Sequence, residues 1–195
     1  MPNSITHNLG RLTDFRGRDT RGQFWLWAAC VVAGAALIWC VALCMAAGMS
    51  AQKVSTYIDA HPELTTVTRR GNTTYRALEG SHPELFSAFH VLVWATAAIT
   101  LVAVWLLAAS VARRLHDRGR SAFWGLAPLP FLVFGLTAVD ALMRQIMAGP
   151  SVVVAWWFLA IFLNSIVYLG VLLTLVIQLS GAGRVEPDRF GAPVG

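Results

Sequence analysis

Four long apolar runs alternate with polar stretches along the chain. The apolar runs cover residues 24–49, 85–112, 121–143 and 151–179. Each is longer than the ~20 residues that an α-helix, rising ~1.5 Å per residue, needs to cross a ~30 Å hydrocarbon core. The pattern predicts an all-α integral membrane protein with four transmembrane helices arranged as two hairpins.

The polar stretches define the other parts of the chain. Residues 1–23 form an N-terminal tail, residues 50–84 a long hydrophilic loop, and residues 180–195 a tail containing Gly and Pro. The transmembrane domain therefore covers residues 24–179. Pro128 and Pro130 are expected to kink or unwind the third helix near its start, because proline lacks the backbone donor of a helical turn.

The distribution of basic residues predicts the side of the membrane on which each polar segment lies. The chain is 56% hydrophobic and 13% charged, whereas soluble domains are roughly 25% charged. Both tails and the stretch between the second and third helices lie on one side and carry ten of the 15 basic residues. The positive-inside rule then predicts cytoplasmic termini and an extracytoplasmic loop. Because the basic residues flank apolar runs, anionic lipid headgroups are favoured as partners over nucleic acid.

The stretch ARRLHDRGRSAFW, residues 112–124, lies between two apolar runs. Its arginines are planar donors suited to phosphate, Gly119 permits a turn, and Ser121 is a candidate N-cap. We expect Asp117 to pair with an arginine of this stretch or of the N-terminal tail, while at least one of Arg113, Arg114 and Arg120 faces phosphate or solvent. The candidate cytoplasmic cluster comprises Arg16, Arg18, Arg21, Arg113, Arg114, His116, Asp117, Arg118 and Arg120.

Three polar residues within the apolar runs are further candidates: Asp140, Asn164 and Tyr168. Asp140 precedes Arg144 by four residues, which favours an ion pair on one helix face, and a proton-relay role is the alternative. Asn164 and Tyr168 share a helix face, where they either pack between helices or line a polar path.

The sequence predicts no catalytic, cofactor or metal site. His116 and Asp117 are neighbours on one helix and so do not face each other, and no nucleophile motif or nucleotide loop accompanies them. Two copies of His-Pro-Glu-Leu, at residues 61–64 and 82–85, offer His and Glu for a metal. The Ser81 to Glu84 spacing explains the second copy better as a helix start. The three cysteines all lie in the first apolar run, without metal-type spacing.

The segments before the first and third helices resemble each other. Arg16-Gly17-Arg18 leads to Phe24-Trp25, and Arg118-Gly119-Arg120 leads to Phe123-Trp124. This similarity suggests two hairpins of the same orientation, as in a parallel repeat.

The same segments carry a family resemblance. FRGRDTRGQFW, residues 15–25, fits F-x-G-R-x-x-R-x-x-F-W, and RRLHDRGRSAFW, residues 113–124, fits R-R-L-H-D-x-G-x-S-x-x-W. Together they resemble the domain-of-unknown-function 805 family of bacterial inner-membrane proteins, from about Leu12 to Pro193. The family's closing pattern, Asn-Arg-aromatic-Gly followed by an acidic residue and Pro, is present only in part at residues 188–193, where Asp188 and Ala192 depart from it. The long loop is also larger than is usual in the family. The resemblance implies a multi-pass protein of the bacterial inner membrane and supplies no activity.

Three functions follow from these observations. The first is a conformationally locked basic cytoplasmic surface that contacts anionic lipid headgroups or a partner, such as a second copy of the chain or another membrane protein. Orientation alone would need arginines and would not need Leu-His-Asp beside them. A small transporter or channel is the second alternative, and a lipid-modifying enzyme is the third.

Overall fold

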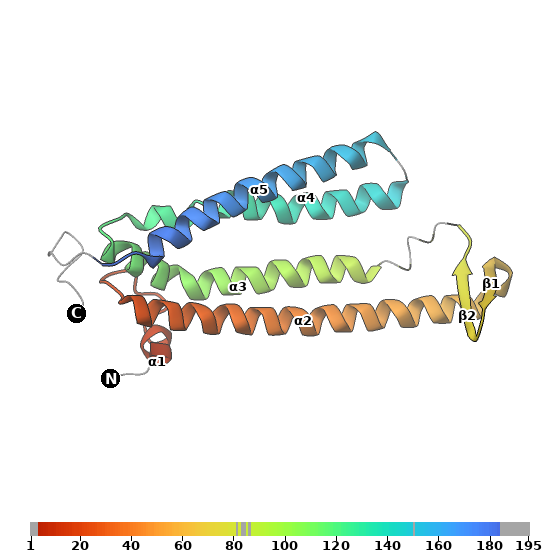
Figure 1. The fold of residues 1–195 in the computed structure, drawn as a ribbon, viewed down its shortest axis with the longest axis horizontal. Coiled ribbons are helices and arrows are strands. Elements are labelled where there is room, and N and C mark those ends of the chain that lie inside the picture. Colours follow the sequence, from red (N-terminus) through yellow and green to blue (C-terminus); the bar gives the residue numbers. More distant parts are fainter. Residues whose placement is uncertain (1–3, 81, 83–84, 86, 150, 184–195) are drawn as a thin grey trace. The chain divides into compact units, whose positions relative to one another are not determined.

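The computed structural model describes residues 4–80, 82, 85, 87–149 and 151–183 (Figure 1). The chain divides into two compact units, one formed by Met1–Leu37 with Ala97–Gly195 and the other by Ile38–Thr96. Helices α2 (Arg21–Ala60) and α3 (Ser87–Asp117) contribute residues to both units. We call the two parts unit 1 and unit 2 and describe each by itself.

Four helices are long and apolar enough to cross a membrane: α2, α3, α4 (Leu129–Ala148) with the 3₁₀ turn before it, and α5 (Val152–Ser180). Most of their apolar side chains are exposed, as Leu101 at 70% and Val152 at 75% illustrate. Continuous apolar surface of this extent is unfavourable in water and favourable in lipid. The chain is therefore a multi-pass membrane protein.

The start of α2 is fixed by a capping box. The Thr20 hydroxyl accepts a hydrogen bond from the backbone N–H of Gln23 at 3.3 Å, and the Gln23 side chain accepts one from the Thr20 N–H at 3.2 Å. This reciprocal pair satisfies two donors that the first helical turn leaves without partners. As a result, α2 begins at Arg21, ahead of the apolar run, and it continues to Ala60, beyond the predicted span.

The third span is unwound at its start, as the two prolines predict. Residues Ala122–Leu126 form a 3₁₀ helix, η3, whose Ser121 N-cap accepts from the Phe123 N–H at 3.4 Å. Helix α4 then begins at Leu129, with Pro128 as its N-cap and Pro130 in its first turn. Helix α5 packs along α4 (Figure 1), and the Asn164 amide joins them by donating to the Phe131 carbonyl at 3.1 Å.

The buried core of unit 1 lies where three helix ends meet. It combines residues from the start of α2, the end of α3 and the end of α5: Phe24, Ala28, Leu115, Leu175 and Leu179. The Trp27 indole also donates to the Leu106 carbonyl at 3.1 Å, which ties α2 to α3. The N-terminal segment, residues 4–20, packs against the same end of unit 1 and begins with helix α1 (Ser4–Leu9).

Unit 2 contains a β-hairpin, so the prediction of a purely helical protein is wrong in this segment and the chain is mostly helical. After a 3₁₀ turn, η1 (Pro62–Leu64), strand β1 (Thr65–Arg70) pairs antiparallel with β2 (Thr73–Leu78). Both strands are rich in the β-branched and aromatic residues that favour extended backbone. Gly71 adopts a φ of 62° in the two-residue turn, where glycine carries no steric penalty.

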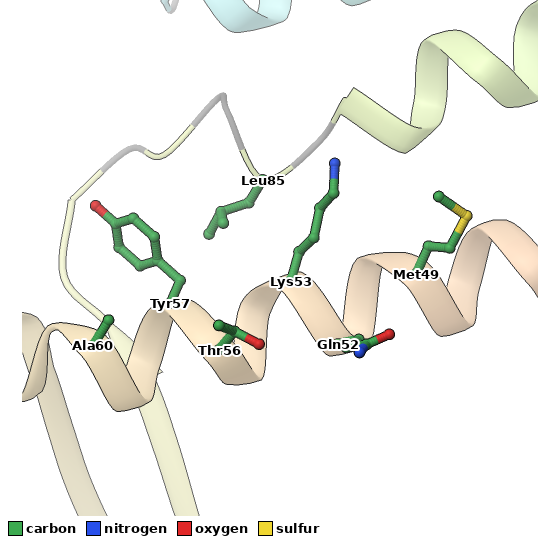
Figure 2. A pocket seen from close by; sticks show the side chains of 7 residues that line it. All are labelled: Met49, Gln52, Lys53, Thr56, Tyr57, Ala60 and Leu85. Carbon is green, nitrogen blue, oxygen red and sulfur yellow. The ribbon is translucent and has the colours of Figure 1, made fainter.

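A pocket of ≈ 460 Å³ lies on unit 2, and Figure 2 shows Lys53 and Tyr57 extending from α2 toward Leu85. The Tyr57 ring stacks on His61 with centroids 4.3 Å apart and lies 4.9 Å from the His82 ring. Both histidines of the repeated tetrapeptide thus contact one tyrosine.

Within the described residues, no group of three or more His, Cys, Asp or Glu side chains could hold a metal ion. The predicted cap from Ser81 to Glu84 lies outside the described residues.

Candidate functional site

The charged stretch between the second and third spans is largely helical. Helix α3 continues through Arg113 and Arg114 to Asp117 and ends in a Schellman motif at Gly119. The Arg120 N–H donates to the Leu115 carbonyl at 2.9 Å, and the Gly119 N–H donates to the His116 carbonyl at 2.8 Å. Gly119 has a φ of 67°, the left-handed conformation that this motif requires. The predicted turn therefore starts after Asp117.

Arg113 holds the N-terminal segment against α3. Its Nε donates to Asp19 Oδ2 at 2.9 Å, and its Nη2 donates to Asn8 Oδ1 at 2.7 Å. Its Nη1 donates to the carbonyls of Arg11 and Asp14 at 2.9 and 2.6 Å. All three guanidinium nitrogens therefore bind acceptors from one segment, which explains how Arg113 is buried to 1% exposure.

Asp117 is shared by two arginines. Arg18 donates from Nε to Asp117 Oδ1 at 3.1 Å and from Nη2 to the Asp117 carbonyl at 3.0 Å. Arg114, one turn before Asp117 on α3, donates to the other carboxylate oxygen, Oδ2. All three side chains are buried. The expected pairing of Asp117 with an arginine is confirmed, and it involves both the N-terminal segment and α3 itself.

Arg114 also holds the end of α5. Its Nε donates to the Leu179 carbonyl at 3.0 Å, and its Nη2 donates to the Gly181 carbonyl at 2.5 Å. Arg118 adds a bond from Nη1 to the Ala182 carbonyl at 2.6 Å. Residues just after α5 are thus bound to the end of α3.

We call the five buried arginine and aspartate residues at this position the buried cluster: Arg18, Asp19, Arg113, Arg114 and Asp117. Arginine and aspartate are almost never fully buried unless they are paired, because removing a charge from water is costly. Here the ion pairs and carbonyl acceptors replace that hydration. Loss of one partner would leave the others buried without a counter-charge, which typically costs about 3–5 kcal/mol of stability. The buried cluster therefore locks the N-terminal segment, α3 and α5 into one arrangement.

The remaining arginines of the predicted cluster have a different environment. Arg16, Arg21 and Arg120 are exposed, and we call them the exposed arginines; Arg118 and His116 are half-buried. Exposure of Arg120 confirms that at least one arginine of the central stretch faces solvent. Arg113 and Arg114, expected as phosphate donors, instead donate to protein acceptors. The predicted basic surface is therefore smaller than the sequence indicates and lies around a buried core of charge.

Sequence reasoning missed two members of the site. Asp19 is fully buried against Arg113 and lies 3.4 Å from the His7 ring, and Asn8 is buried at the end of α1. The sequence did contain a signal for Asp19, because it is the aspartate of FRGRDTRGQFW, the segment that carries the family resemblance. Nearby, Arg11 and the backbone N–H of Arg16 donate to Asp14, which lowers the pKa of the Asp14 carboxyl below its ordinary value.

The two similar segments differ in environment. Gly17 and Gly119 both have positive φ, at 88° and 67°. However, Phe24 is buried at 2% exposure, whereas Phe123 is 78% exposed. Arg18 is likewise buried while Arg120 is exposed. The Arg-Gly-Arg turns therefore have similar backbone conformations, but the residues around them differ in burial.

The polar residues of the later spans have local contacts. Asp140 forms an ion pair with Arg144, as the spacing predicts. Asn164 donates to the α4 backbone, and Gly135 leaves room for it: a Cβ there would lie 3.3 Å from the amide nitrogen. Tyr168 lines an apolar cavity of ≈ 410 Å³ in unit 1. Asn164 therefore serves packing between α4 and α5.

The close approach of Gly183 to the buried cluster gives a first prediction. A Cβ at Gly183 would overlap the Asp117 carboxylate, which two arginines hold in place. For a Cβ at Gly181, the three nearest atoms all belong to the flexible end of Arg118. Gly183→Ala is therefore expected to destabilise the protein by about 1–3 kcal/mol, and Gly181→Ala by less, in thermal unfolding in detergent. Equal effects would show that the Asp117 carboxylate can move aside.

Comparisons with known proteins identify the family of this chain. The chain matches the family described as "Protein of unknown function (DUF805)" over residues 12–192 and belongs to it. The match extends from the N-terminal segment to the residues after α5, so it includes every member of the buried cluster. Comparisons with curated proteins and with solved structures find no match.

Proposed function

We propose that this protein is a membrane-embedded binding platform, in which the buried cluster fixes a set of exposed arginines to contact anionic lipid headgroups. One observation carries the proposal: the arginines divide into buried, ion-paired members and exposed members on the same segments. Arg16 is two residues from buried Arg18, and Arg21 is two residues from buried Asp19. The buried residues thus hold the backbone that carries the exposed ones.

The exposed arginines suit phosphate chemically. A guanidinium presents a planar fork of donors that matches phosphate oxygens and is more weakly hydrated than an ammonium group. Arginines near an anionic membrane surface gain about 1 kcal/mol each. By the positive-inside rule, we place this end of unit 1 in the cytoplasm and the β-hairpin outside, in a bacterial inner membrane.

The contacts of the other candidates favour this platform over transport. Asp140 pairs with Arg144, and Asn164 is bonded to the backbone of α4, so local contacts account for these side chains without a transport path. A proton relay through Asp140 would instead require proton flux in proteoliposomes that Asp140→Asn abolishes.

A triple substitution tests the platform. Arg16→Gln, Arg21→Gln and Arg120→Gln together remove three positive charges and replace no member of the buried cluster. We expect the affinity for phosphatidylglycerol to fall by about 3 kcal/mol, on the order of 100-fold, in lipid titrations followed by native mass spectrometry. Affinity for phosphatidylcholine is expected to change little.

The matched control removes the same charge elsewhere. Arg69, Arg70 and Arg76 are exposed on the β-hairpin, and their triple change to Gln is expected to leave phosphatidylglycerol binding unchanged. If both triples weakened binding equally, net charge alone would account for it and the proposed surface would be refuted. Capture of a protein in place of lipid, lost in the first triple only, would also overturn the lipid assignment.

A further inference from the structure

The apolar cavity of unit 1 is long and nearly free of polar side chains. Of the residues that line it, Thr100 and Tyr168 alone carry polar side-chain atoms. Its ≈ 410 Å³ falls within the range of small-molecule pockets, roughly 300–1,000 Å³. The walls come from α2, α3, η3, α4 and α5, including Val32, Ala108, Val111, Leu126, Leu132 and Leu172. An apolar cavity between membrane-spanning helices favours hydrocarbon chains over water.

The cavity is elongated along α3. Ala112 lines one part and Thr100 another, and these residues are separated by about 18 Å at a helical rise of ~1.5 Å per residue. An apolar space of this length fits an extended alkyl chain better than a compact ligand. The small side chains of Ala103, Ala108 and Ala112 provide the width on the α3 wall.

The cavity reaches the segments that carry two exposed arginines. Phe15, which lines the cavity, directly precedes Arg16, and Ala122, which also lines it, follows Arg120 by two residues. Cationic donors and an alkyl-sized space are therefore adjacent in the chain at the end of unit 1 where α3 terminates. A ligand that satisfies both has an anionic headgroup and a hydrocarbon chain.

We propose that the cavity binds one acyl chain of an anionic phospholipid whose phosphate contacts Arg16 and Arg120. This inference rests on the proposed function and specifies the lipid and its binding site. A free phosphate would use the arginines and leave the apolar space without a role. A zwitterionic lipid would fill the space but would carry a cationic group near the arginines, so charge favours the anionic lipid.

The test fills the cavity without touching the arginines. Ala108→Phe places a ring on the cavity wall, whereas Ala155→Phe makes the same change on an exposed face of α5. In phosphatidylglycerol titrations of the full chain in detergent, we expect Ala108→Phe to weaken the tightest site at least about tenfold, the effect of excluding a few buried methylenes. Ala155→Phe is expected to match the wild type.

A second measurement uses the wild-type chain and so does not depend on the folding of a variant. Phosphatidylglycerol with a photoreactive group in the middle of its acyl chain is expected to label the cavity walls, at residues 103–112 and 125–132. Labelling confined to exposed faces such as Ala155 would mean an annular lipid only and would overturn the inference.

The two proposals fail in different ways. If the triple arginine variant loses phosphatidylglycerol binding while Ala108→Phe binds like the wild type, the surface holds the headgroup alone; the cavity assignment is then wrong and the proposed function stands. If Ala108→Phe weakens phosphatidylglycerol and phosphatidylcholine equally and the arginine triple changes neither, the cavity binds chains without regard to charge. That result refutes the proposed function and the anionic specificity together.

Discussion

Asp117→Asn is expected to cost about 3–5 kcal/mol of stability, the usual penalty for breaking a buried ion pair from one side. The carboxylate of Asp117 accepts from Arg18 and from Arg114, and all three side chains are buried. Asparagine keeps the size but removes the charge, so two guanidinium groups would remain buried with weaker acceptors. We expect a large fall in the apparent melting temperature and in the monodisperse fraction after detergent extraction.

The matched control is Asp140→Asn. Asp140 also pairs with an arginine on its own helix, but this pair is more exposed than the Asp117 pairs, with the Arg144 side chain 63% and the Asp140 side chain 19% exposed. Exposed pairs contribute only about 0–1 kcal/mol because water and salt screen them. Similar losses in the two variants would contradict the view that burial makes the Asp117 pairs important.

Arg113→Ala is expected to release the N-terminal segment as well as to lower stability by about 3–5 kcal/mol. The substitution would leave Asp19 buried without its guanidinium and would remove the donors to Asn8, Arg11 and Asp14. These acceptors belong to one segment, which receives four hydrogen bonds from Arg113. Limited trypsin digestion is therefore expected to cut faster after Arg11 and Arg16 in the variant.

Two further variants separate charge from geometry. Arg113→Lys keeps the positive charge but offers a single nitrogen in place of the planar fork, so we expect an intermediate loss. Arg120→Ala changes an exposed arginine and is expected to stay within about 0.5 kcal/mol of the wild type. Wild-type digestion and stability in Arg113→Lys would show that charge alone, and not the fork of hydrogen bonds, holds the segment.

The four spans could be predicted because length and apolarity alone decide whether a helix can cross a membrane. The ends of the helices depend on weaker local signals. The Thr20 to Gln23 capping box moves the start of α2 to Arg21, and the Schellman motif at Gly119 places the end of α3 at Asp117. The β-hairpin was missed because its strands are short and lie in a polar loop, where no alternation of apolar and polar residues indicates a strand.

The site was predictable in part. Asp117 was expected to find an arginine, since an acid amid arginines near an apolar run has few other partners. Burial of Arg113 and Arg114 depends on segments far away in the sequence: the N-terminal segment accepts from Arg113, and the end of α5 and the residue Gly181 after it accept from Arg114. Neighbouring positions on a helix point in different directions. Two adjacent arginines can therefore bind different segments, which charge patterning alone does not reveal.

The ends of the helices also account for the charge balance of the buried cluster. Three arginines and two aspartates leave one excess positive charge within a buried site. The cluster lies at the C-terminal ends of α3 and α5, each equivalent to about half a negative charge, and at the N-terminal end of α2, equivalent to about half a positive charge. Asp19 precedes α2, while Arg114 donates to the carbonyls at the end of α5. The peptide dipoles of the spans themselves thus favour a majority of arginines at this point.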